Sequence, residues 1–126
     1  MPAMRRPKNL NLLTIHFPWS AIMSIGHRLA GIVLVFCIPY LLYLFELSLK
    51  GETEFLSVQM QLQQPLVKLL WLTIIVAISH HFFAGIRFLL LDIELGVSKC
   101  QAQKTAIIVL LCTTLSAFIV AFLLFL

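Results

Sequence analysis

Apolar residues fill three long blocks of the chain, and most polar residues lie in the segments between them. The blocks run over residues 20–49, 66–91 and 105–126. Each is about 20 residues or longer, which is what a helix needs to cross roughly 30 Å of hydrocarbon. We therefore predict an all-α fold, a three-span transmembrane bundle that forms a single domain over residues 1–126. Pro39 lies inside the first block and predicts a kink there.

Composition supports a membrane location. Hydrophobic residues make up 61% of the chain, and the mean hydropathy is +1.03, which is too apolar for a soluble domain of this length. Residues 50–65, KGETEFLSVQMQLQQP, form a polar loop with room for a short interfacial helix. The net charge of +4 is modest, so it bears on membrane topology and subunit contacts rather than on nucleic acid.

Basic residues predict the orientation. Seven lysines and arginines lie in or near the N-terminal segment 1–19 and the second loop, and two lie on the side of the first loop. The positive-inside rule then puts the N-terminus in the cytoplasm and the C-terminus in the periplasm. The basic N-terminal segment has the features of neither a cleavable signal peptide nor a mitochondrial presequence. We expect a bacterial inner-membrane protein, with a mitochondrially encoded protein as the alternative.

The ionisable side chains gather at one depth between the first two spans. His27 and Arg28 lie near the predicted cytoplasmic start of the first span, and Arg87 and Asp92 near the same end of the second. His81 lies six residues deeper than Arg87, about 9 Å along a helix. This is where a polar or charged ligand would bind. We expect no second histidine of this chain at the depth of His81 in another span.

Two adjacent histidines in the second span cannot face one ligand, since neighbours on a helix point about 100° apart. Ala77 and Gly85 lie four residues either side of His81, and such small residues admit a close helix or a flat ring. This environment suits a haem ligand. A hydrogen bond to another helix explains His81 equally well at this point, and it is the default for His80.

Ser24 and Arg28 share a face of the first span, being four residues apart. A hydroxyl and a guanidinium together suit a carbonyl or an anion. The alternative is that Arg28 anchors the helix at the headgroups and Ser24 bonds its own backbone. The three cysteines have no metal-ligand spacing, so they predict neither a zinc site nor a disulfide framework.

Two stretches fit a known pattern. The segment RRPKNLNLLTIHFPWSAIMSIGHRLAGI, Arg5 to Ile32, has an Arg-Pro, a Leu-rich amphipathic stretch and a form of Ser-Ile-x-His-Arg-x-Ser/Thr-Gly. The segment HFFAGIRFLLLD, His81 to Asp92, has a form of His-x-x-x-Gly-x-Arg-His followed by an aspartate. In this order the two motifs resemble the cytochrome b subunit of succinate dehydrogenase, and the resemblance covers essentially the whole chain.

The resemblance implies a role for each of five residues. His81 would be an axial ligand of haem b, and a partner anchor subunit would supply the other axial histidine. Ser24 and Arg28 would contact ubiquinone. His27 would lie near a haem propionate, and Arg87 is a further candidate for that contact. No residue of this chain is expected to be catalytic in its own right.

The resemblance also implies partners. The chain would be the membrane anchor of complex II, in which electrons from succinate pass through a flavoprotein and an iron–sulfur subunit to ubiquinone. This chain has neither a dinucleotide-binding fingerprint nor a cysteine cluster, so FAD and iron–sulfur clusters would belong to the partner subunits. Its partners would be these two subunits, a second anchor subunit and the lipid bilayer, with no nucleic acid.

Two positions depart from the family pattern. Ala30 replaces the usual hydroxyl residue before Gly31, and Phe88 replaces the histidine after the motif arginine. Neither change affects His81, Ser24 or Arg28. Three alternatives remain: the anchor of a quinol:fumarate reductase, a non-redox membrane scaffold whose histidines only pack helices, and a channel or transporter.

Overall fold

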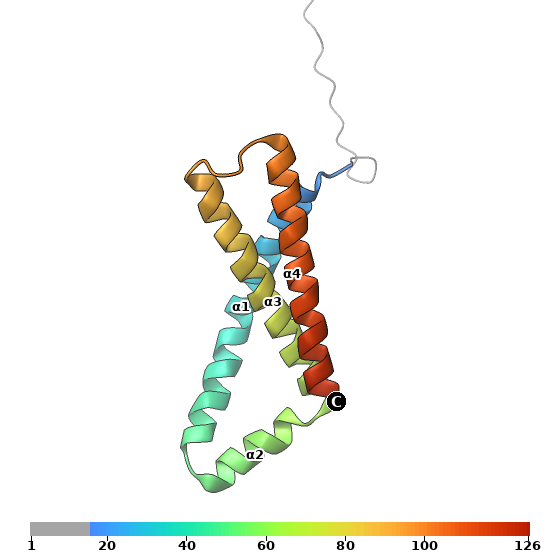
Figure 1. The fold of residues 1–126 in the computed structure, drawn as a ribbon. Helices are drawn as coiled ribbons and strands as arrows, with labels where there is room; N and C mark the ends of the chain where they lie inside the picture. The colour runs from blue at the N-terminus through green and yellow to red at the C-terminus, as the bar shows by residue number, and fades with distance from the viewer. Residues whose placement is uncertain (1–15) are drawn as a thin grey trace, which may run out of the picture.

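The computed structural model describes residues 16–126, which form four helices. These are α1 (Trp19–Leu49), α2 (Glu52–Leu62), α3 (Pro65–Asp92) and α4 (Lys99–Phe125) (Figure 1). Three of them, α1, α3 and α4, are long and apolar enough to cross a membrane. No strand occurs within residues 16–126. The prediction of an all-α, three-span bundle is therefore confirmed.

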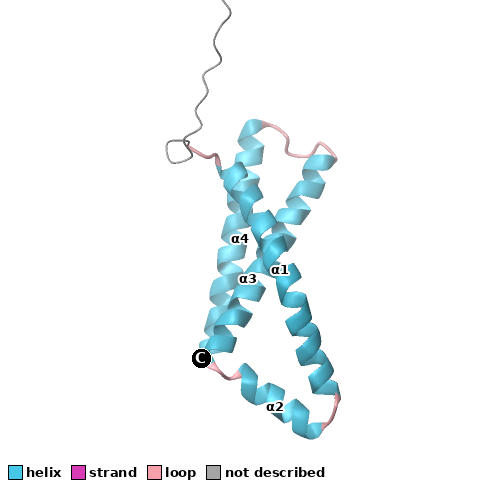
Figure 2. Cartoon of the chain, turned by 180° about the vertical axis from the view of Figure 1, so that it is seen from behind, coloured by secondary structure: helices cyan, strands magenta, loops and turns pink. Residues whose placement is uncertain are grey.

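Helix α3 is central, because both other long helices, α1 and α4, pack against it. Helix α4 runs beside α3, while α1 crosses α3 in its first half and separates from it in its second half (Figures 1 and 2). The short helix α2 joins the separated ends of α1 and α3. The start of α1 and the α3–α4 loop lie at one end of the bundle, and α2 and the C-terminus lie at the other. This pairing of ends agrees with the predicted topology.

The helix bounds follow the predicted blocks, except at the start of α4. That helix begins at Lys99, six residues before the predicted apolar span. Ser98 caps it, because its hydroxyl oxygen accepts a hydrogen bond from the Gln101 backbone N–H at 3.3 Å. The spacing Ser-x-x-Gln is a capping-box signal. The polar loop contains a short helix, as expected, and α1 continues through Pro39. The kink at Pro39 stays a prediction.

The buried core of this chain is small. It is centred on Met23 of α1, Ala84 of α3, and Ala106 and Val109 of α4. Most large apolar side chains lie on the outside, as Phe36 does with 78% of its surface exposed. Lipid tails are as apolar as these side chains, so association between spans depends on close packing and interhelical hydrogen bonds. Small residues at the crossings are therefore essential to the fold.

We predict that Gly26→Ala lowers the melting temperature of the purified protein in its membrane complex, whereas Gly85→Ala does not. A Cβ at Gly26 would lie 2.7 Å from Nε2 of His80, but a Cβ at Gly85 would lie 3.7 Å from its nearest neighbour, an ordinary contact. Overpacking typically costs about 1–3 kcal/mol. Both changes raise helix propensity equally, so the difference between them reports the clash. Equal melting temperatures would contradict the packing described here.

Candidate functional site

His80 points into the centre of the bundle. It is 9% exposed, and its Nε2 lies 3.4 Å from the carbonyl oxygen of Met23 in α1. Its Nδ1 lies 3.3 Å from the hydroxyl of Thr113 in α4. One imidazole of α3 thus connects all three spanning helices. The expectation that His80 makes a hydrogen bond to another helix is confirmed.

His81 points to a different side of α3 and is half-buried. Its Nδ1 lies 3.1 Å from the carbonyl oxygen of His27. A carbonyl can only accept, so Nδ1 carries the proton and donates this bond. In the tautomer with its hydrogen on Nδ1, the ring keeps a lone pair on Nε2. An imidazole fixed in this way is suited to bind a metal through Nε2.

His27 lies directly against His81. The two rings stack with centroids 4.1 Å apart and an interplanar angle of 12°. The edge of Phe88 packs on His27 at 5.1 Å between centroids, and Gly85 leaves room for its Nε2. The expectation that no second histidine of this chain lies at the depth of His81 is therefore wrong. Crossing of α1 over α3 brings them together, and counting residues along each span separately did not reveal it.

The stacked pair does not form a two-histidine axial set, because axial ligands approach a metal from opposite sides. Among residues 16–126, no three histidine, cysteine, aspartate or glutamate side chains gather to hold a metal ion. Within this part of the chain, His81 therefore offers a single open ligand position.

A groove of about 670 Å³ opens beside the stacked rings, between α1 and α3. His27 and His81 line it together with Arg28, Gly31 and a strip of apolar side chains further along α1, namely Ile32, Leu34, Val35, Phe36 and Ile38. A Cβ at Gly31 would lie 3.1 Å from Cε1 of His81, so the glycine lets the imidazole sit close to α1. The groove is basic at one end and apolar along its length.

Ser24 and Arg28, the two candidate residues of the first motif, lie near the start of α1. Arg28 is exposed and lines the groove. Ser24 is half-buried, one helical turn before it. The predicted pairing of hydroxyl and guanidinium on one helix face thus agrees with the helical geometry of α1.

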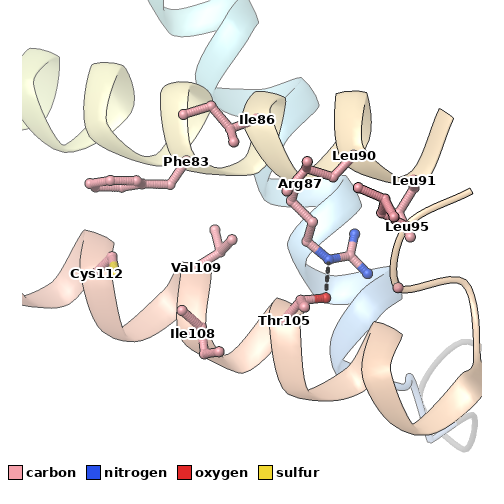
Figure 3. Close-up of a pocket in the computed structure, with 11 residues that line it drawn as sticks. Phe83, Ile86, Arg87, Leu90, Leu91, Leu95, Thr105, Ile108, Val109 and Cys112 are labelled. Atoms are coloured by element: carbon pink, nitrogen blue, oxygen red, sulfur yellow. Dashed lines mark hydrogen bonds between the residues drawn. The ribbon is translucent and has the colours of Figure 1, made fainter. Parts of the chain in front are cut away.

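Arg87 faces α4 instead of the groove. Its Nε donates to the Thr105 hydroxyl at 3.0 Å, and its Nη2 donates to the Ala102 carbonyl at 2.9 Å. It is 6% exposed and borders a separate apolar pocket of about 350 Å³ between α3 and α4 (Figure 3). The structure therefore brings His81, His27 and Arg28 together but separates Arg87 from them.

A helical stripe in the sequence explains this separation. His80, Ala84 and Arg87 follow the spacing i, i+4, i+7 and are all buried, which is the pattern of a helix face turned to a core. Ala77 is buried on the same face, so the space that this small residue leaves lies beside His80 rather than beside His81. The spacing that joins His80, Ala84 and Arg87 is present in the sequence and is the signal that Arg87 faces α4.

Comparison with known proteins identifies the family of the chain. Residues 2–121 match the model of the succinate dehydrogenase/fumarate reductase transmembrane subunit family. The chain belongs to this family. It is also 37% identical over 103 residues to the succinate dehydrogenase cytochrome b556 subunit of Coxiella burnetii (strain RSA 493 / Nine Mile phase I), an alignment that covers 81% of this chain and 82% of that protein. The chain is thus a membrane-anchor subunit of an enzyme complex of the succinate dehydrogenase class.

We predict that Thr105→Val lowers the melting temperature of the purified complex by removing the acceptor for Nε of Arg87. Interhelical hydrogen bonds in membranes are worth about 1 kcal/mol. Thr114→Val in the same helix is the matched control, because Thr114 is exposed and bonds only the Leu110 carbonyl of its own helix. A Thr105→Val protein as stable as this control would contradict a structural role for the Arg87–Thr105 contact.

Proposed function

We propose that this subunit binds haem b and forms part of the ubiquinone site of a succinate:quinone oxidoreductase. The observation that carries the proposal is the bond from Nδ1 of His81 to the His27 carbonyl, which leaves Nε2 as a metal ligand. The Coxiella relative is named a cytochrome b556 subunit. This name supports the same assignment.

The residues present fit a haem. His81 supplies one imidazole nitrogen, as haem iron in b-type sites requires. Ile32, Val35 and Phe36 offer an apolar wall for a macrocycle, while Arg28 and the edge of His27 offer donors for carboxylates at the other end. A bound haem b supplies one-electron transfer. We assign Arg87 to the α3–α4 contact instead, since two of its nitrogens already bond α4.

The other axial ligand would come from a partner anchor subunit. The stacking of His27 supports this, because two rings that lie side by side would not hold one metal ion between them. The open groove and the exposed apolar face of α1 leave room for another helix. FAD and the iron–sulfur clusters would lie in the flavoprotein and iron–sulfur subunits. We place the complex in a bacterial inner membrane, with the start of α1 on the cytoplasmic side.

Ser24 and Arg28 would bind the quinone. The Ser24 hydroxyl would donate a hydrogen bond that orients a carbonyl oxygen of the ring. The Arg28 guanidinium would stabilise negative charge as it develops on that oxygen during reduction, which is where a fixed positive group accelerates a reaction most. The exposed position of Arg28 on the lining of the groove supports this role, because a quinone could reach its guanidinium there.

The family description includes fumarate reductase as well as succinate dehydrogenase. An anchor of a quinol:fumarate reductase is therefore the second candidate, with the same architecture and the opposite physiological direction. Deleting the gene distinguishes them: loss of aerobic growth on succinate supports the dehydrogenase direction, and loss of anaerobic growth on fumarate supports the reductase.

We predict that the purified wild-type complex shows a low-spin b-type α band in its dithionite-reduced minus oxidised spectrum. His81→Ala, with all subunits retained, loses or broadens this band because iron loses one axial nitrogen. His16→Ala is a control, since His16 is exposed and precedes α1. A wild-type complex without a b-type band would remove the haem assignment and favour a scaffold role for this chain. An unchanged band in His81→Ala would place the ligand elsewhere.

We predict that Arg28→Leu lowers succinate:ubiquinone reductase activity by about 10²-fold, the usual effect of removing one electrostatic stabiliser of a transition state. Succinate oxidation measured with a soluble dye that bypasses the quinone should be unchanged. Lys104→Leu, which removes an exposed cation of α4, serves as the control for charge alone. Normal rate and affinity for ubiquinone in Arg28→Leu would show that this residue is not at the quinone site.

A further inference from the structure

Two neighbouring imidazoles of α3 reach main-chain carbonyls of α1 that are one helical turn apart. His80 contacts the carbonyl of Met23 at 3.4 Å, and His81 contacts the carbonyl of His27 at 3.1 Å. The proposed function uses His81 and leaves His80 without a role. The regular spacing of the two carbonyls nevertheless makes the contacts parts of one interaction between the helices.

His80 has polar contacts with both neighbouring helices, α1 and α4. The Met23 carbonyl can only accept, so His80 donates through Nε2–H. The Thr113 hydroxyl donates its one hydrogen to the Val109 carbonyl of its own helix at 2.9 Å, and its oxygen lies in polar contact with Nδ1 of His80 at 3.3 Å. Gly26 supplies the space, because a Cβ there would lie 2.7 Å from Nε2 of His80. The ring is held by α1 on one side and by α4 on the other.

The two contacts act in different directions. Side chains of adjacent helical residues point about 100° apart. His80 therefore contacts α1 from the core side, whereas His81 contacts it from the groove side. Together they fix both the rotation of α3 and its height relative to α1. With the His80 contact removed, the bond from His81 to the His27 carbonyl would have to hold this register alone.

We propose that His80 is a positioning residue for the haem ligand. By fixing α3 against α1, it keeps Nδ1 of His81 on the His27 carbonyl and aims Nε2 into the groove. The bond at Nδ1 orients the ligand ring and raises its basicity, which tunes the metal. Hydrogen bonds weaken steeply with distance and angle, so a small rotation of α3 changes that tuning. This inference rests on the proposed function, because it requires His81 to bind haem.

The test compares four variants of the purified complex. His80→Leu removes both contacts, and His80→Gln keeps an amide N–H where Nε2 donates to Met23. Thr113→Val removes only the α4 partner, and Thr114→Val is its control, since that hydroxyl bonds only its own helix. The readouts are the midpoint potential of the haem and the EPR signal of the oxidised low-spin iron, which reports axial ligand orientation. Neither readout responds to a mere loss of stability.

We expect His80→Leu to retain haem but to shift both the midpoint potential and the EPR signal. His80→Gln should return them toward the wild-type values, Thr113→Val should give a smaller shift, and Thr114→Val none. Wild-type potential and EPR signal in His80→Leu would overturn the proposal. If His80→Leu does not assemble, Thr113→Val decides: a shift supports the proposal, and wild-type values overturn it.

These outcomes separate the inference from the function on which it rests. A wild-type complex without a b-type spectrum, or a His81→Ala spectrum identical to wild type, would overturn both. A haem that depends on His81 but is indifferent to His80 and Thr113 would overturn the positioning role alone and leave the haem assignment intact.

Discussion

The carbonyl oxygen of His27 lies 3.1 Å from Nδ1 of His81, and this contact determines which ring nitrogen remains for a metal. In hydrocarbon an imidazole without a partner is costly, so the contact also stabilises the crossing of α1 and α3. One interaction thus joins the fold and the proposed function: the same bond that satisfies a polar group inside the membrane sets the tautomer and direction of the imidazole that we propose as the haem ligand. The same crossing stacks the His27 ring on His81.

Glycines at the crossing make this geometry accessible. Gly26 gives room to His80, and Gly31 gives room to His81, each at a distance that a Cβ would violate or strain. Because lipid provides little hydrophobic drive for helix association, such close approaches and interhelical hydrogen bonds hold the spans together. The crossing that these glycines permit is therefore also the place where the proposed cofactor site forms.

Sequence patterns were sufficient for the three spans and for the different faces of His80 and His81, because block length and the 100° helical step determine both. They were not sufficient for the meeting of His27 and His81, which depends on how α1 crosses α3. Depth and the family resemblance also grouped Arg87 with His81, whereas the buried stripe through His80 and Ala84 turns Arg87 toward α4. The depth of a residue follows from its position along one helix. Which residues of two helices touch depends on where and at what angle the helices cross.

Chemical rescue of His81→Gly tests the central claim most directly. The glycine variant of the complex is purified, and its reduced spectrum is recorded with and without free imidazole. Our account predicts that the low-spin b-type band is absent without imidazole and returns when imidazole enters the space left by the side chain, since the ring itself is the ligand. A wild-type band in His81→Gly without imidazole would contradict the account, because the iron would then be bound by another residue.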